Sequence, residues 1–141
     1  MLRGCLIGGF LLLAGLSPLQ AQNAPAPLRI ELNRLEPRDN ACRVWMVLNN
    51  SGGEALDPLR LDLVLFGKDG VVSRRLAVDA PVPANRTVVR LFDVAGQSCD
   101  GLGSVLLNDV LACGSQEADA RNACVARLTL ASRVSGVTFD K

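Results

Sequence analysis

The clearest β-hairpin pattern in this chain is LRLDLVLFGKDGVVSRRLAV, residues 59–78. Leucine occupies every second position from Leu59 to Leu65, which is the period of a strand with one buried face. The Asp69-Gly70 pair is a tight-turn signal, because both residue types tolerate the positive φ that such turns need. A second apolar run covers residues 71–78. We therefore predict an antiparallel hairpin over residues 59–78.

Strand patterns recur on both sides of this hairpin. Apolar residues alternate with polar ones from Leu28 to Asn33, and a second alternating row runs from Cys42 to Leu48. A turn-rich run, residues 49–53, ends that row. Later segments rich in apolar or β-branched residues are also expected to be strands: residues 87–94, 104–113, 124–130 and 134–139. A short helix is the alternative for residues 104–113.

The spacing of these segments predicts the fold class. About seven short strands with turn signals between them are typical of an antiparallel sandwich. No apolar stripe of useful length has the helical period of 3.6, and the mildly helical segment 116–126 lacks a long apolar face. We predict an all-β fold, a single antiparallel immunoglobulin-like β-sandwich over residues 28–141.

Residues 1–21 have the pattern of a secretory signal peptide. Arg3 supplies the positive charge, and an uncharged, mostly apolar run covers residues 5–16. This run is shorter than the roughly 20 apolar residues that a membrane-spanning helix needs. We place cleavage after Ala21, which leaves residues 22–27 as a disordered linker and a mature chain that does not insert into the membrane.

Cleavage leaves four cysteines, Cys42, Cys99, Cys113 and Cys124. An even number in an exported chain indicates disulfides, because the compartment is oxidising. There is no CxxC pair and no zinc-module spacing, so no metal site is expected. Sequence alone allows three pairings. Cys113 and Cys124 flank a polar stretch between two apolar runs, so we predict a Cys113–Cys124 bridge, which leaves Cys42 to pair with Cys99.

Part of the chain, Val44–Val94, resembles the immunoglobulin-like modules of bacterial exported proteins, including FxLYD-type and adhesion-type domains. The residues that carry the resemblance are turn and strand motifs: Asn49-Asn50-Ser51-Gly52, the Leu59–Leu65 strand, Phe66-Gly67-Lys68-Asp69-Gly70 and Pro83-Ala84-Asn85-Arg86-Thr87. The resemblance implies a non-enzymatic binding or spacer domain. The chain departs from this pattern after Val94, and it lacks the Cys…Trp…Cys spacing of antibody domains.

Two residue types that many enzymes require are missing. The 141 residues include no histidine and no tyrosine, which excludes Ser-His and Cys-His nucleophile pairs, zinc bound through histidine and a tyrosine acid. The formal net charge is +1, whereas nucleic-acid-binding proteins normally carry a basic surplus. We therefore expect a protein that is not an enzyme and has no cofactor and no nucleic-acid partner.

A small hydrolase or metal-binding module is the alternative function. The carboxylates available for it lie in the cysteine-bearing last third of the chain: Asp100, Asp109, Glu117 and Asp119. Two of them could converge as a general acid and base, or several could bind calcium. No DxDxDG run supports calcium, and solvated acids in loops are common.

The strand expected at residues 42–48 presents Arg43, Trp45 and Val47 on the face opposite its inward row. Trp and Arg are favoured at interaction hot spots, so these three are the candidate binding residues. The alternative is that Trp45 lies under a loop or in the core. Arg74-Arg75 and Arg90 could form a modest basic patch, or they are solvated positions that discourage aggregation through strand edges.

Together these patterns predict a non-catalytic exported β-sandwich that binds a protein or a cell-envelope component. The compartment is the periplasm for a Gram-negative host and the cell exterior otherwise. The residues expected to carry binding are those on the Arg43–Val47 face.

Overall fold

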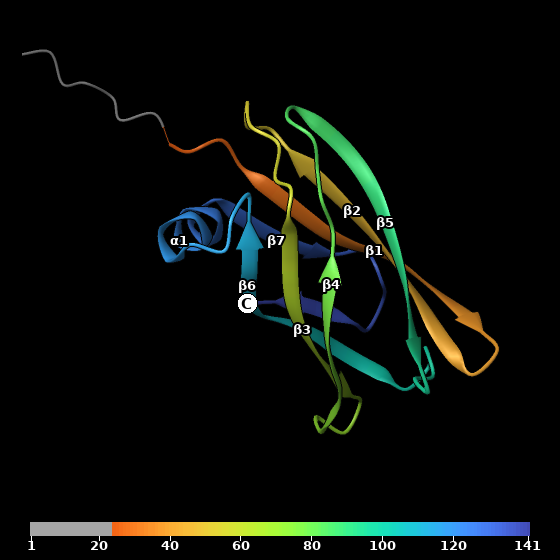
Figure 1. Cartoon of the computed structure of the whole chain (residues 1–141). Coiled ribbons are helices and arrows are strands. Elements are labelled where there is room, and N and C mark those ends of the chain that lie inside the picture. Colours follow the sequence, from red (N-terminus) through yellow and green to blue (C-terminus); the bar gives the residue numbers. More distant parts are fainter. Residues whose placement is uncertain (1–23) are drawn as a thin grey trace, which may run out of the picture.

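Two four-stranded sheets packed face to face make up most of the computed structural model, which describes residues 24–141 (Figure 1). The elements in chain order are β1 (Leu28–Arg38), β2 (Ala41–Asn50), β3 (Leu59–Gly67), β4 (Val72–Asp79), β5 (Arg86–Ala95), β6 (Leu102–Cys113), α1 (Ala118–Arg127), β7 (Leu128–Ser132) and β8 (Thr138–Asp140). One sheet, here the β2 sheet, has the order β5-β2-β1-β7. The other, the β3 sheet, has the order β4-β3-β6-β8. The predicted all-β sandwich is thus confirmed, and the predicted signal peptide lies outside the described residues.

The alternating rows form the core between the two sheets. The leucines of β3, from Leu59 to Leu65, are all buried, and so are Leu28, Ile30 and Leu32 of β1. In β2 every second residue from Cys42 to Asn50 is buried. The hairpin predicted at residues 59–78 is present as β3 and β4 in antiparallel register. Period-two burial therefore places the apolar rows of β1, β2 and β3 inward, as predicted.

Strand direction differs from the prediction at two sheet edges. Four pairings, β1–β2, β2–β5, β3–β4 and β3–β6, are antiparallel, as expected. However, β7 runs parallel to β1, and β8 runs parallel to β6. Each of these strands is separated from its pairing partner by a long stretch of chain, from Arg38 to Leu128 and from Cys113 to Thr138, so no tight hairpin imposes an antiparallel direction. The sandwich therefore has eight strands in the described chain, with mixed edges.

The prediction of a strand from residue 124 onward was wrong at its start. Residues 118–127 form helix α1, and β7 begins only at Leu128. Alanines suit a helix, and the charges match the helix dipole, with Asp119 in the first turn and Arg127 in the last. Cys124 is the one buried residue of α1, so the segment lacks the apolar stripe that would have revealed it. Residues 104–113 lie in a strand, β6, and not in the alternative helix.

Both predicted disulfides are present. Cys42 at the start of β2 is bonded to Cys99 in the loop before β6. Cys113 at the end of β6 is bonded to Cys124 in α1. The two bridges indicate an oxidising compartment outside the cytoplasm. Within residues 24–141, none of the helical structure could span a bilayer.

A buried amide ties the end of β2 to three other segments. Asn50 is fully buried, and its Nδ2 donates to the backbone carbonyl oxygens of Glu54 and Pro83 at 2.8 and 3.1 Å. Its Oδ1 accepts from the Gly52 N–H and from Arg127 of α1, both at 3.0 Å. Because every polar atom of this side chain has a partner, its burial carries no unsatisfied group.

Candidate binding face

Arg43, Trp45 and Val47 lie together on the outer side of the β2 sheet, as the alternation predicted. Their neighbours on the same strand, from Cys42 to Leu48, are buried in the core, whereas these three are only partly buried. Trp45 is therefore neither a core residue nor covered completely by a loop.

Strand β5 adds two more apolar side chains to this face. In the β2–β5 register, Trp45 lies opposite Leu91 and Val47 lies opposite Val89. Val89 and Leu91 are each 46% exposed. We call the group Trp45, Val47, Val89 and Leu91 the outer apolar patch. Directly opposed residues in adjacent strands have close Cβ atoms, so the four side chains form one surface.

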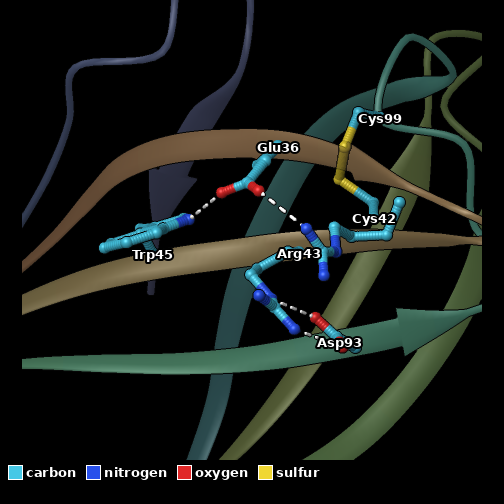
Figure 2. A network of polar contacts seen from close by, with 7 residues as sticks. Glu36, Cys42, Arg43, Trp45, Asp93 and Cys99 are labelled. Carbon is cyan, nitrogen blue, oxygen red and sulfur yellow. Dashed lines mark hydrogen bonds and ion pairs between the residues drawn. A yellow bond between two sulfur atoms is a disulfide. The ribbon is translucent and has the colours of Figure 1, made fainter.

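The orientation of Trp45 is set by groups on β1. Its Nε1–H donates to Glu36 Oε2 at 2.9 Å, and Figure 2 shows the indole pointing toward that carboxylate. Glu36 also accepts from Arg38 at 3.2 Å. The Arg34 guanidinium lies 5.7 Å from the centre of the indole ring, within cation–π range. These contacts restrict the ring to one position on the sheet surface.

Arg43 is held by an ion pair with β5. Its Nε and Nη2 donate to the two carboxylate oxygens of Asp93, at 2.7 and 3.0 Å (Figure 2). These hydrogen bonds raise the pKa of Arg43 and lower the pKa of Asp93. The bidentate pair lies at one end of the outer apolar patch, next to the Cys42–Cys99 bridge (Figure 2). Arg43 therefore serves this face as a fixed polar group and not as a free cation.

A second polar group borders the patch on the β1 side. Glu31, opposite Val47 in the register, accepts hydrogen bonds from Arg29, Asn33 and Arg133 at 3.1, 2.9 and 2.7 Å. The hydrogen bond from Asn33, with those from the two arginines, lowers the pKa of Glu31 to about 2. An apolar centre with a rim of paired polar groups is the arrangement found in protein–protein interfaces.

Two carboxylates of the alternative function, Asp100 and Asp109, lie far apart. Asp100 lies in the turn before β6, and Asp109 lies seven residues beyond the start of β6, which is about 20 Å along an extended strand. The Asp109 carboxylate lies 3.9 Å from Arg121 of α1 and accepts from the Val110 N–H at 2.7 Å. Residues 24–141 contain no group of three or more Asp, Glu, Cys or His side chains placed to hold a metal. A catalytic pair of Asp100 with Asp109 is therefore ruled out by distance.

Sequence reasoning missed the β5 half of this face. The segment 87–94 was correctly predicted as a strand, but both of its sides carry apolar residues, so alternation did not distinguish the exposed side from the buried one. Charge offered one signal: Asp93 is the acid on β5 that can pair with Arg43. Only the register between β5 and β2 shows that Val89 and Leu91 lie beside Val47 and Trp45.

Comparison of the chain with known proteins finds no matching family model, no similar curated protein and no similar solved structure. The resemblance of Val44–Val94 to exported immunoglobulin-like modules therefore stays a prediction.

Proposed function

We propose that this protein is a non-catalytic, exported β-sandwich that binds a partner protein in the cell envelope through the outer face of the β2 sheet. For a Gram-negative host the compartment is the periplasm. The two disulfides support export.

The observation that carries this proposal is the outer apolar patch. Val89 and Leu91 expose nearly half of their surface on the face that also holds Trp45 and Val47. Contiguous apolar surface that is rimmed by polar residues marks interaction sites on soluble proteins. The surrounding ion pairs, Arg43–Asp93 and Arg29–Glu31, are already formed within the chain. A partner that covers the patch would therefore gain apolar contact without desolvating unpaired charged side chains.

Site-specific photo-cross-linking in the native host tests this face. A photo-reactive amino acid replaces Leu91 in one variant and Ala77 in another, because Ala77 is exposed on the outer side of the β3 sheet. We expect a discrete cross-linked protein from position 91 and none from position 77. Equal products from both positions, or none from position 91, would show that the β2 sheet does not present the binding face.

Truncation of the tryptophan measures its contribution. Trp45→Ala is expected to reduce the yield of the position-91 product about tenfold, because central Trp residues are typical hot spots. Arg43→Ala should reduce it less. Glu36 Oε2 loses its donor in the Trp45 variant, but the Glu36 side chain is 24% exposed, so water can replace the indole N–H while Oε1 keeps its hydrogen bond from Arg38. Val71→Ala, at an exposed valine in the β3–β4 turn, is the matched control and should retain the full yield. Retention by Trp45→Ala and Arg43→Ala together would mean that the face is wrongly assigned.

A further inference from the structure

Strand β5 is the longest of the four edge strands in the described chain. It has ten residues, against eight in β4, five in β7 and three in β8. Its register with β2 runs without a shift over all ten pairs, whereas the β3–β4 pairing contains one irregularity. Figure 1 shows β5 at the margin of the β2 sheet. Soluble proteins usually shorten, bulge or cover such edges, so a long regular edge strand calls for an explanation.

The backbone hydrogen bonds show which β5 residues face the open edge. The Gly96 N–H donates toward the β1–β2 turn, to the Asn40 carbonyl oxygen at 2.8 Å. The Ala95 carbonyl oxygen instead accepts from Arg74 of β4 at 3.3 Å. In an antiparallel ladder both backbone groups of a residue point the same way, and this direction alternates along the strand. The N–H and C=O groups of Thr87, Val89, Leu91 and Asp93 therefore point away from β2, and the same four residues place their side chains on the outer face.

Two arginines, Arg74 and Arg90, lie on the core-facing side of the β5 edge. Arg90 lies on the core-facing side of β5, opposite Met46, and its Nε donates to the Pro81 carbonyl oxygen at 3.0 Å. Arg74 bonds the backbone oxygens of Ala95 and Gly96. Within residues 24–141, neither guanidinium has a carboxylate within ion-pair distance. Asp93, the one acid of β5, is already paired with Arg43.

We propose that an extended, acidic segment of the partner protein adds to β5 as a new outer strand of the β2 sheet. Its alternate apolar side chains would pack beside Val89 and Leu91, and the intervening Asp or Glu side chains would face Arg74 and Arg90. Main-chain hydrogen bonds supply affinity in such strand addition, and the alternating side chains supply specificity. This proposal rests on the proposed function, because the added strand extends the same outer face.

Charge disfavours a second copy of this chain as the occupant. Two copies could pair their β5 strands symmetrically in antiparallel orientation. The register that pairs all four residues facing the open edge places Val89 of one copy opposite Leu91 of the other. The same register places Arg90 opposite Arg90 at the centre of the interface. Like charges directly opposite one another destabilise a strand pair, whereas an acidic strand would be attracted at the same position.

A synthetic peptide tests the proposal directly. The probe is the acetylated and amidated peptide SVEVEVEVS, labelled with a fluorophore, and fluorescence anisotropy measures its binding to the disulfide-bonded mature protein. We expect saturable binding of this peptide and at least about tenfold weaker binding of SVKVKVKVS, in which lysine replaces glutamate. Equal binding of the two peptides would overturn the proposed acidic specificity.

Removal of one backbone N–H from the open edge of β5 tests whether main-chain hydrogen bonds contribute to peptide binding. Val89→Pro removes an N–H that faces the open edge and leaves the ladder with β2 intact, and proline is tolerated at such positions. We expect it to weaken peptide binding about tenfold, and the control Val89→Thr, which keeps the N–H, to weaken it at most about threefold. A peptide N-methylated at alternate residues makes the same test without changing the protein. Undiminished binding in both tests would exclude strand addition.

Two outcomes separate this proposal from the proposed function. If position 91 gives a cross-linked partner but SVEVEVEVS does not bind, the face binds a protein and strand addition is wrong. If the peptide binds and Val89→Pro abolishes binding while no partner cross-links at position 91, the edge accepts a strand although the apolar face is not the partner site. Sedimentation of the wild-type protein as a dimer that Val89→Pro dissolves would identify a second copy as the occupant and overturn the proposal.

Discussion

The Glu31 side chain links β1 to the segment that follows β7. It is 6% exposed although it lies on the outer face of β1. Hydrogen bonds from Asn33, Arg29 and Arg133 compensate for its burial, and Arg133 follows β7 about a hundred residues later in the chain. The carboxylate therefore joins β1 to the segment after β7 while its neighbours Val47 and Trp45 stay accessible.

The pH dependence of stability follows from this carboxylate. The pKa of Glu31 is about 2 in the folded protein, against an ordinary value of 4.5, so its contribution is present above about pH 4.5 and is lost as the pH falls toward 2. Glu31→Gln should lower the free energy of unfolding at pH 7 by ~1–2 kcal/mol and flatten its pH dependence between about pH 5 and 2. Urea unfolding at several pH values measures both. Glu54→Gln, at an exposed carboxyl, is the control, and coinciding profiles for wild type and Glu31→Gln would contradict the prediction.

At the scale of elements, helix α1 depends on its disulfide more than on its own sequence. It has ten residues, and isolated helices of that length are marginal in water. Cys124 is its one buried residue, and the other contacts that tie it to its surroundings are polar, such as Arg121 near Asp109 of β6. The Cys113–Cys124 bond therefore supplies the main attachment of α1 to the β3 sheet.

Removal of this bridge should loosen α1 locally. In the double variant Cys113→Ser/Cys124→Ser, we expect the amides of α1 to lose most of their protection from hydrogen exchange, while those of β2 and β3 keep theirs. Hydrogen exchange followed by mass spectrometry, on the wild-type protein and on this variant, gives both quantities. Unchanged protection of α1 would show that its packing, and not the bridge, holds it in place.

At the scale of the whole molecule, the Cys42–Cys99 bridge joins the two layers. Cys42 begins β2 in one sheet, and Cys99 lies in the loop that leads into β6 of the other. The bond closes a loop of 57 residues, compared with 11 for Cys113–Cys124. In the chain-entropy account these loops correspond to about 4 and about 3 kcal/mol. The longer bridge restrains the unfolded chain more and spans the sandwich.

The two bridges should therefore differ in their effect on global stability. Cys42→Ala/Cys99→Ala is expected to lower the free energy of unfolding by ~3–4 kcal/mol, with a single cooperative transition. Chemical denaturation of this variant beside Cys113→Ser/Cys124→Ser provides the comparison. The prediction is wrong if removal of the shorter bridge destabilises the whole domain as much as removal of the longer one.

Much of the sandwich could be predicted because strand burial is a local property. The alternation in residues 42–48 and 59–65 correctly placed their apolar side chains inward and Trp45 outward. The same method mistook residues 124–127 for strand, because Val125 is apolar although it is exposed on α1. It also gave no reason to join Val89 and Leu91 to Trp45, since their contact depends on a register between strands about 45 residues apart.

The sequence by itself determined the class of fold and the inward rows of β1, β2 and β3, because period-two patterning and the spacing of turns act within short segments. Only the tertiary structure decided which strands became neighbours, which of them lie at the edges and which apolar residues stayed exposed. The physical reason is that strand order depends on closing long loops and on packing two complete sheets together. The outer apolar patch and the edge position of β5 belong to that second kind of information.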